Sequence, residues 1–283
     1  MNTSEFSAWR ESLKTLRQQP LIMGIVNTTT DSFSDGGQFI NSQKALSHAL
    51  SLIKQGAHVI DIGGESSRPG AESISVQEEL DRVLPVIEML RNESDTVISI
   101  DTCKPEVMKE AVAAGAGLIN DIRALKADDA LTVAAQLNVP VCLMHMQGEP
   151  KTMQHQVHYE APVMDELIAF FDERMNACTN AGITTNNIII DPGFGFGKKI
   201  SHNLTMIAQL KRLSIFNCPI LIGVSRKSTI GELLQMTVDK RLIGSISMAL
   251  LALIHGANIV RVHDVDETKQ MIKIYQAVTE AAI

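Results

Sequence analysis

Eight short apolar runs, each carrying a polar side chain at or near its end, constrain the fold of this chain more than any other feature. The runs cover residues 21–27, 58–64, 97–102, 117–122, 140–146, 187–193, 219–225 and 258–264. Their nearly continuous hydrophobicity is typical of parallel strands that are buried on both faces. The polar residues are Asn27, Asp61, Asp101, Asn120, His145, Asp191, Ser225, Arg261 and His263. A (β/α)8 barrel needs this pattern, because its active site is built at the carboxyl ends of its strands.

Helical patterns separate the runs, so strands and helices are expected to alternate. The predicted helices cover residues 45–55, 76–91, 105–114, 127–137, 159–181, 203–210 and 242–255. Glycines stand where helix C-terminal caps are expected, at Gly56, Gly115, Gly182 and Gly256. The fold class predicted is therefore α/β, a single (β/α)8 TIM barrel.

The barrel domain is predicted to span residues 21–283, after an N-terminal amphipathic extension at residues 1–20. Apolar residues recur at helical spacing in this extension, which predicts a helix packed against the outside or bottom of the barrel: Phe6, Trp9, Leu13 and Leu16. Long connections follow strands 1, 2 and 5, at residues 28–40, 63–75 and 146–158. They are expected at the C-terminal face, where long loops often act as lids.

Composition narrows the choice of partners and compartment. The 283 residues are 45% hydrophobic and carry a net charge of −7, with a pI near 5.6, which argues against a nucleic-acid partner. The four cysteines are scattered and form no CxxC pair, which fits free thiols in a reducing cytoplasm. No apolar stretch approaches the ~18 residues of a membrane span. We expect a cytoplasmic protein without a membrane partner.

One set of polar side chains is predicted to point into the barrel mouth and to recognise a flat ring: Asp101, Asn120, Asp191 and Lys227. A carboxylate accepts two parallel N–H bonds, an amide both donates and accepts, and a lysine donates. A 2-amino-4-oxo pyrimidine ring presents the matching pattern. The alternative for either aspartate is an ordinary strand-end carboxylate that caps the next helix.

A second set is predicted on the opposite side of the mouth: Asn27, Ser67, Arg68, Arg261 and His263. These residues offer donors and positive charge suited to a phosphate or diphosphate. Asn27 could equally hold Mg²⁺ through its carbonyl oxygen. Residues 225–229, SRKST, are expected to open a helix whose N–H groups and Ser228 hydroxyl can receive a carboxylate or phosphate.

The glycine-rich run at residues 191–199 is not a nucleotide loop. Pro192 and Lys199 break the Walker A pattern, and Lys198 takes the last glycine position of the dinucleotide fingerprint. Its glycines are expected instead to let the backbone and two phenylalanine rings approach a flat ligand, at Gly193, Gly195, Gly197, Phe194 and Phe196.

At these residues the chain resembles the dihydropteroate synthase family of the folate pathway. The similar motifs, in the family's order, are MGIVNTTTDSFSDGG, DIGGESSRPGA, ISIDT, LINDI, MHMQG, DPGFGFGK, GVSRKSTIG and VRVHD, across roughly residues 21 to 281. The resemblance implies a (β/α)8 barrel, usually a homodimer. It also implies that the chain joins 6-hydroxymethyl-7,8-dihydropterin diphosphate to 4-aminobenzoate with loss of pyrophosphate, using Mg²⁺.

The resemblance assigns roles residue by residue. It implies that the pterin is bound by Asp101, Asn120, Asp191 and Lys227. It implies that the diphosphate and Mg²⁺ are bound by Asn27, Arg261 and His263. Around the aminobenzoate it places Phe33, Ser67, Arg68, Pro69, Gly195, Phe196 and Ser228, and we also expect Ile122 and Met144 to line the substrate site. The residues expected to act in catalysis are Asp101, Lys227, Arg261, His263 and Asp35, with Asp35 and Asp101 acting on Mg²⁺ or on developing charge.

The chain departs from the family pattern at Thr30, where a proline is usual, and at Ser67, where a threonine is common. Both departures lie on the aminobenzoate side. Two other functions remain open at this point. One is a pterin-binding methyltransferase domain that serves a corrinoid partner. The other is a catalytically silent paralogue, which is expected to have lost Lys227, Arg261 or His263; this chain retains all three.

Overall fold

Eight parallel strands form a barrel. The computed structural model describes residues 1–12, 19–28, 38–67, 70–149, 151–154 and 157–281. The strands are β1 (Leu21–Asn27), β2 (Val59–Gly63), β3 (Val97–Asp101), β4 (Leu118–Asp121), β5 (Val141–Met144), β6 (Ile188–Asp191), β7 (Leu221–Ile222) and β8 (Ile259–Val262). They are hydrogen-bonded in the order β6-β5-β4-β3-β2-β1-β8-β7. A parallel bridge between Ile190 and Ile220 joins the two ends of this sheet, which confirms the predicted (β/α)8 barrel.

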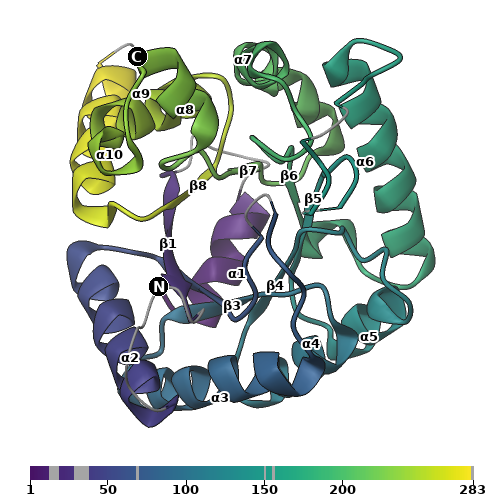
Figure 1. The fold of residues 1–283 in the computed structure, drawn as a ribbon, viewed down its shortest axis with the longest axis vertical. Coiled ribbons are helices and arrows are strands. Elements are labelled where there is room, and N and C mark those ends of the chain that lie inside the picture. Colours follow the sequence, from purple (N-terminus) through teal and green to yellow (C-terminus); the bar gives the residue numbers. More distant parts are fainter. Residues whose placement is uncertain (13–18, 29–37, 68–69, 150, 155–156, 282–283) are drawn as a thin grey trace.

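Helices enclose the strands (Figure 1). They are α1 (Thr3–Ser12), α2 (Gln38–Gln55), α3 (Val76–Glu93), α4 (Pro105–Ala113), α5 (Ala130–Leu137), α6 (Val163–Asn180), α7 (Ile200–Ala208), α8 (Ser228–Leu234), α9 (Leu242–Ile254) and α10 (Val265–Glu280), with short 3-10 turns η2 (Thr185–Asn187), η3 (Leu210–Phe216) and η4 (Val238–Lys240). α2 begins seven residues before the helix predicted at 45–55. The connection after β1 is correspondingly shorter than the predicted 28–40.

Glycines end four of the helices as predicted. Gly56, Gly115, Gly182 and Gly256 have φ values of +117°, +115°, +95° and +110°. This left-handed backbone is costly for residues that carry a Cβ and is common at the position after a helix C-cap. Each glycine therefore turns the chain from a helix toward the next strand.

Two large apolar clusters among the described residues hold the barrel together. The larger one fills the space between the strands and the surrounding helices. The smaller one lies inside the barrel and includes Met23, Val59 and Val97, with Phe6 and Trp9 of α1 packed against them. The N-terminal helix predicted against the outside or bottom of the barrel therefore lies at the bottom, where Phe6 is fully buried.

Polar residues replace apolar ones higher in the barrel interior. Strand register pairs Asp61 with Ser99 in the neighbouring strand and Asp101 with Asn120. Side chains alternate between the two faces of a strand. The inward positions above the apolar layer therefore carry the predicted polar set, at the carboxyl ends where barrel enzymes build their active sites.

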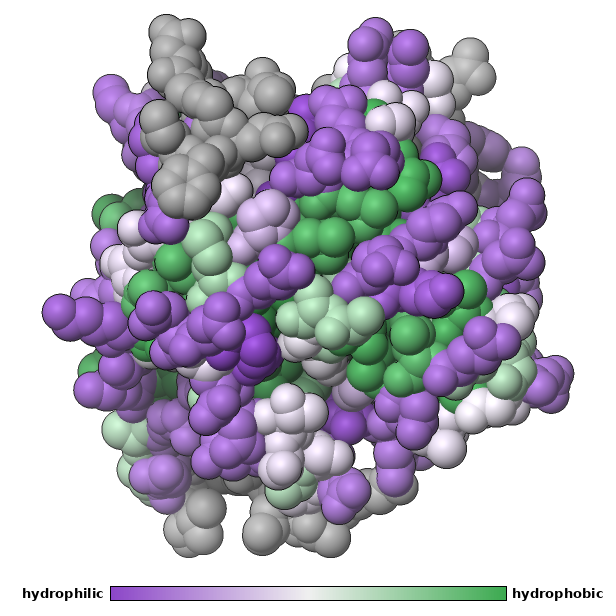
Figure 2. Space-filling view, turned by 90° about the horizontal axis from the view of Figure 1, so that it is seen from below, coloured by the Kyte–Doolittle hydropathy of each residue, from purple (hydrophilic) through white to green (hydrophobic). Residues whose placement is uncertain are grey.

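The outer surface carries no membrane-spanning segment among the described residues, since none of their helices is long and apolar enough to cross a bilayer. Figure 2 shows the face that lies at the bottom of Figure 1, over α2, α3 and α4, where hydrophilic side chains alternate with apolar ones. The large exposed hydrophobic side chains gather elsewhere, chiefly on α8, α9 and α10: Leu233, Leu234, Ile243, Leu251, Ile254, Ile274 and Val278.

Candidate active site

A charged network crosses the interior of the barrel. Arg261 in β8 donates from Nε to Asp61 Oδ2 at 2.6 Å and from Nη2 to Asp101 Oδ2 at 2.7 Å. Asn120 Nδ2 donates to the same Asp61 oxygen at 3.2 Å. The prediction that Arg261 lies across the mouth from Asp101 and Asn120 is therefore wrong. Arg261 lies two residues after Ile259, which belongs to the cluster inside the barrel, so its side chain points inward too. Its guanidinium there meets Asp61 of β2 and Asp101 of β3.

Burial and charge pairing shape the ionisation of this network. Burial alone lowers the pKa of Arg261, but the charges of Asp61 and Asp101 outweigh it and raise that pKa. Burial also raises the pKa of Asp101, and Arg261 opposes the rise. Arg261 therefore stays cationic, and both aspartates pair with this one cation in a region of low dielectric.

Asp191 and Lys227 lie close enough to Arg261 for their charges to interact with it. Asp191 ends β6, is 5% exposed, and accepts from Gly193 N through Oδ1 at 2.8 Å. Burial raises the pKa of Asp191 to about 6, although the Gly193 N–H and Lys227 oppose this. Lys227 precedes α8, and its ammonium stands 3.9 Å from the centroid of the Phe196 ring. Burial and then Arg261 lower the pKa of Lys227 to about 8.

The glycine-rich loop after β6 packs directly on the loop after β5. A Cβ added to Gly193 meets His145 O at 1.9 Å, and one added to Gly197 meets Gln147 O at 2.4 Å. Both glycines also have positive φ, +69° and +59°. Only glycine fits where two backbones approach this closely. Gly193 and Gly197 therefore let one loop pack on another, whereas the prediction was an approach to a flat ligand. The ring of Phe194 is buried in the larger apolar cluster between strands and helices, so its predicted place beside a ligand is wrong.

The buried side chain of Lys198 holds this glycine-rich loop in place. Its ammonium, 3% exposed, donates to Gly193 O at 3.0 Å and Phe196 O at 3.1 Å, and lies 2.9 Å from His145 Nδ1. Burial lowers the pKa of Lys198 to about 7. Burial and then Lys198 hold the pKa of His145 well below its usual value, so a neutral imidazole accepts a hydrogen from the lysine. These contacts hold the loop after β6 against the loop after β5.

An apolar wall stands beside the charged groups. Met144, Met153 and Phe196 form a buried cluster, with Ile122 and Met146 packed against it. The predicted site residues Ile122, Met144 and Phe196 are therefore brought together. A flat ring placed among Asp191, Lys227 and this cluster has apolar contact beside its polar edge, which is the usual composition of a small-molecule site.

The remaining predicted residues lie at the rim or outside the described residues. Asn27 ends β1 opposite Gly63, Ser67 is half-buried, and Ser228 is exposed at the start of α8. His263 Nδ1 lies 3.0 Å from the hydroxyl of Ser225. Four predicted residues, and the departure at Thr30, lie outside the described residues: Phe33, Asp35, Arg68 and Pro69.

Buried charges anchor the first residues of the loop that carries Ser67. Arg82 Nη1 donates to Gly64 O at 2.8 Å. Lys104 binds both Glu65 and Glu79, and Glu79 is only 1% exposed. The base of this loop is therefore held rigidly against α3.

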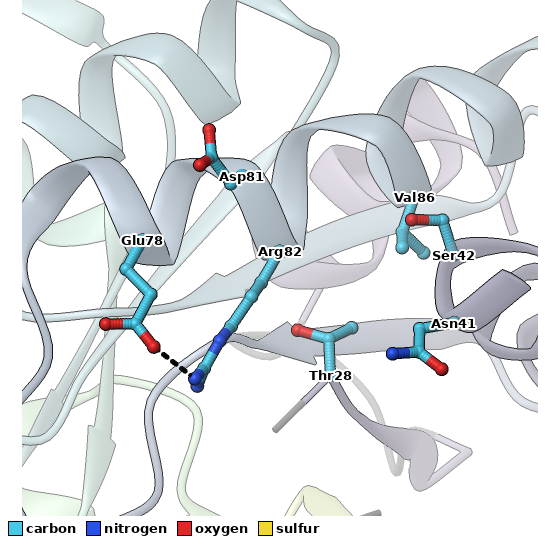
Figure 3. A pocket seen from close by; sticks show the side chains of 7 residues that line it. All are labelled: Thr28, Asn41, Ser42, Glu78, Asp81, Arg82 and Val86. Carbon is cyan, nitrogen blue, oxygen red and sulfur yellow. Dashed lines mark hydrogen bonds and ion pairs between the residues drawn. The ribbon is translucent and has the colours of Figure 1, made fainter. Parts of the chain in front are cut away.

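A cavity of about 160 Å³ lies outside the barrel wall, lined by residues of α2 and α3 and by Thr28. Figure 3 shows Arg82 paired with Glu78 beside it, and Asn41 and Ser42 across from them. None of the predicted site residues lines this cavity. It is distinct from the network of Asp101, Asp191 and Arg261.

Two residues at the mouth were not among the predicted site residues. Asp61 carries the same signal as the predicted set, a polar residue near the end of an apolar run. Lys198 gave a weaker signal, a charge beside a glycine-rich loop. The sequence alone does not reveal that its ammonium points inward.

Replacing Lys198 with methionine is expected to destabilise the protein and weaken ligand binding. The variant keeps the apolar stem but leaves the buried Gly193 and Phe196 carbonyls without their donor, at about 1–3 kcal/mol for each unpaired group. Chemical denaturation measures the change. The matched control is Lys199→Met, because Lys199 is the exposed neighbour. Equal midpoints for the two variants are incompatible with a role for Lys198 in holding the loop.

Comparison with known proteins agrees with this geometry. The sequence pattern of the family described as pterin binding enzyme matches residues 23–263. The dihydropteroate synthase of Haemophilus influenzae is 51% identical over 262 residues, covering 93% of this chain and 95% of that protein. A structure of Xanthomonas albilineans dihydropteroate synthase with 4-aminobenzoic acid superposes with a TM-score of 0.87 at 47% identity, covering 93% of this chain and 94% of that one. Another, in complex with 7,8-dihydropteroate, gives 0.82 at 43% identity with the same coverage.

The fold and the site together define a (β/α)8-barrel enzyme whose polar interior opens at the carboxyl ends of the strands. Across this barrel the sequence match is continuous from β1 to the end of β8. The chain belongs to the pterin-binding enzyme family, among its dihydropteroate synthases.

Proposed function

We propose that this chain condenses 6-hydroxymethyl-7,8-dihydropterin diphosphate with 4-aminobenzoate to give 7,8-dihydropteroate and pyrophosphate. The observation that carries the proposal is the placement of Asp101, Asn120, Asp191, Lys227 and Arg261 at one barrel mouth. The Xanthomonas albilineans structures with 4-aminobenzoic acid and with 7,8-dihydropteroate support the choice of substrates.

The pterin ring is bound by the carboxylates and the lysine. Asp191 has one oxygen engaged by Gly193, which leaves the second for the ring amine and N–H of the pterin. Lys227, held over Phe196, donates to a ring carbonyl or nitrogen. Burial of Asp191 strengthens these charge-assisted bonds, because little water competes for the same groups.

The diphosphate is proposed to bind to Arg261, His263 and Asn27. Asn27 brings an amide oxygen to the end of β1 and forms no side-chain hydrogen bond with another described residue. No group of three or more His, Cys, Asp or Glu side chains suited to a metal occurs among the described residues. Mg²⁺ commonly binds through one or two protein oxygens together with substrate phosphates. The residues therefore fit a Mg²⁺ shared with the diphosphate, with Asn27 as its protein ligand and Asp35 as a further candidate.

The proposed reaction is a dissociative displacement. The bond from the pterin methylene carbon to the diphosphate oxygen breaks, and its electron pair leaves with the diphosphate. Bound Mg²⁺ supplies charge neutralisation of that leaving group. Arg261 and His263 add positive charge beside it, and Asp101 faces the cationic carbon. The nitrogen lone pair of 4-aminobenzoate then forms the new C–N bond, and the proton that the nitrogen loses passes to the released diphosphate or to solvent. No protein nucleophile is required.

The aminobenzoate is proposed to bind beside the glycine-rich loop. Phe196 and Gly195 form part of its wall, and Ser228 meets its carboxylate at the start of α8. Ser67, Arg68, Phe33 and Pro69 are proposed to complete the pocket. The fixed base of the loop before Ser67 supports a rigid anchor on that side.

Pyrophosphate release from the purified protein tests the function. Release is expected only when the pterin diphosphate, 4-aminobenzoate and Mg²⁺ are all present. Release without 4-aminobenzoate indicates a hydrolase, and binding without release indicates a silent pterin-binding protein. Methyl transfer from a methylated pterin to a corrinoid partner is the third outcome to assay.

Affinity for the pterin is expected to be greatest between about pH 6 and about pH 8. As pH falls through the pKa of Asp191, near 6, the carboxylate gains a proton and loses the charge that accepts the ring N–H groups. As pH rises through the pKa of Lys227, near 8, the lysine loses the proton that it donates. Calorimetry with the pterin alcohol measures both limbs, and Lys227→Met is expected to remove only the alkaline one. An affinity that stays constant from well below pH 6 to well above pH 8 contradicts the proposed roles of Asp191 and Lys227.

We also propose that the protein is a homodimer of the cytoplasm. The exposed apolar side chains on α8, α9 and α10, such as Ile243 at 79% exposure and Ile274 at 69%, support a protein interface there. Four cysteines without disulfides support a reducing compartment. Sedimentation equilibrium tests the dimer, and an Ile243→Lys variant is expected to weaken it.

A further inference from the structure

Asp61 is a carboxylate buried inside the barrel beneath the predicted site. It lies in β2, its side chain is 0% exposed, and its Cα partner in β3 is Ser99. The inward position two residues before it is Val59, which belongs to the apolar floor of the barrel. Asp61 therefore carries the first charge above the apolar floor, and its side chain does not reach the surface.

One oxygen of Asp61 holds two residues of the site at once. Oδ2 accepts from Arg261 Nε at 2.6 Å and from Asn120 Nδ2 at 3.2 Å. Arg261 Nη2 is taken by Asp101. Two contacts on one planar guanidinium fix the plane of the group as well as its position. Nη1 forms no hydrogen bond with another described residue, so it is available to a ligand.

This arrangement costs stability. Oδ1 of Asp61 and the Ser99 hydroxyl are buried without a hydrogen-bond partner among the described residues. Interior layers of such barrels are usually filled by branched apolar side chains, and replacing a buried ion pair by apolar residues is often neutral or stabilising. A role in positioning neighbouring side chains therefore explains the buried charge of Asp61 better than a role in stability does.

We propose that Asp61 is a positioning residue that sets the guanidinium plane of Arg261, so that the site prefers the pterin diphosphate over the free pterin alcohol. The inference rests on the proposed function for the identity of these two ligands. It does not require turnover, because the preference is a ratio of two dissociation constants.

The test is a double-variant cycle read by calorimetry with both ligands. Asp61→Asn is expected to reduce the preference for the diphosphate at least ~10-fold, equivalent to ~1.4 kcal/mol. In an Arg261→Ala background the same change is expected to alter the preference less than about twofold, since no guanidinium remains to be positioned. Full loss in both backgrounds, or no loss in either, overturns the proposal.

A matched control separates positioning from general destabilisation. Asp121 is equally buried and near the end of β4, but it accepts from the Arg123 and Leu125 backbone N–H groups outside the charged network. Asp121→Asn is expected to lower the melting temperature and leave the ligand preference unchanged. A matching loss of preference in this control identifies the effect of Asp61 as nonspecific.

Stability gives a second readout if Asp61→Asn alone does not fold. Arg261→Ala leaves Asp61 buried without its cation, whereas the double variant removes that charge as well. The double variant is therefore expected to melt at a higher temperature than Arg261→Ala. A lower melting temperature contradicts the pairing on which the proposal depends. The proposed reaction fails separately, through the absence of pyrophosphate release by the parent protein.

Discussion

Replacement of Asp191 with alanine is expected to abolish measurable pterin binding. The ring amine and N–H of the pterin lose a buried, charge-assisted acceptor, which costs on the order of 2 to 4 kcal/mol, or roughly 30- to 900-fold in affinity. The effect is large because Asp191 is 5% exposed at the end of β6. Water therefore cannot readily replace the lost carboxylate as an acceptor for the pterin.

Asp191 also supports the glycine-rich loop through the Gly193 N–H, so a second variant must separate the two roles. Asp191→Asn keeps an oxygen for Gly193 but presents an amide N–H₂, in place of the second oxygen, to the ring. It is expected to fold like the parent and still lose most pterin affinity. Calorimetry gives the affinities, and denaturation gives the stabilities. Binding within threefold of the parent in both variants rules out Asp191 as the pterin anchor.

Much of the fold could be predicted because its signals are local. Each apolar run lies within a few residues of the strand that it predicted, and the four capping glycines adopt left-handed backbone. β7 is the weakest case, since the run at 219–225 yields a strand of only two residues, Leu221 and Ile222. No predicted helix covered α10, although Val265, Thr268, Met271 and Ile272 form its buried face. That helical spacing was present in the sequence.

The pairing of side chains across the barrel could not be predicted. Arg261 and Asp61 are 200 residues apart in sequence, and their contact depends on the register of β8 on β1 and of β1 on β2. A pattern of polar residues at strand ends predicts which side chains face the barrel mouth. It does not predict which of these side chains contact each other. The same limit hid Lys198, whose position depends on the contact between the loops after β5 and β6.

Replacement of Arg261 with alanine is expected to cost far more affinity for the pterin diphosphate than for the pterin alcohol. The guanidinium is held by Asp61 and Asp101, so its remaining donors face the ligand in a fixed orientation. A charge-assisted contact to phosphate of this kind is worth roughly 1.5–3 kcal/mol. Calorimetry with both ligands, in the presence of Mg²⁺, measures the two losses separately.

The same variant is also expected to unfold more easily. Removing one partner of a buried ion pair leaves an uncompensated charge, at about 3–5 kcal/mol, and here two carboxylates are left facing each other. Arg174→Ala is the matched control, because Arg174 is a buried arginine that donates to the Ala124 and Leu125 carbonyls and not to the carboxylates that Arg261 binds. It is expected to lower stability while both pterin ligands bind as before. Equal losses for the diphosphate and the alcohol in Arg261→Ala place this arginine on the ring or in packing, and the leaving group then depends on His263 and Asn27.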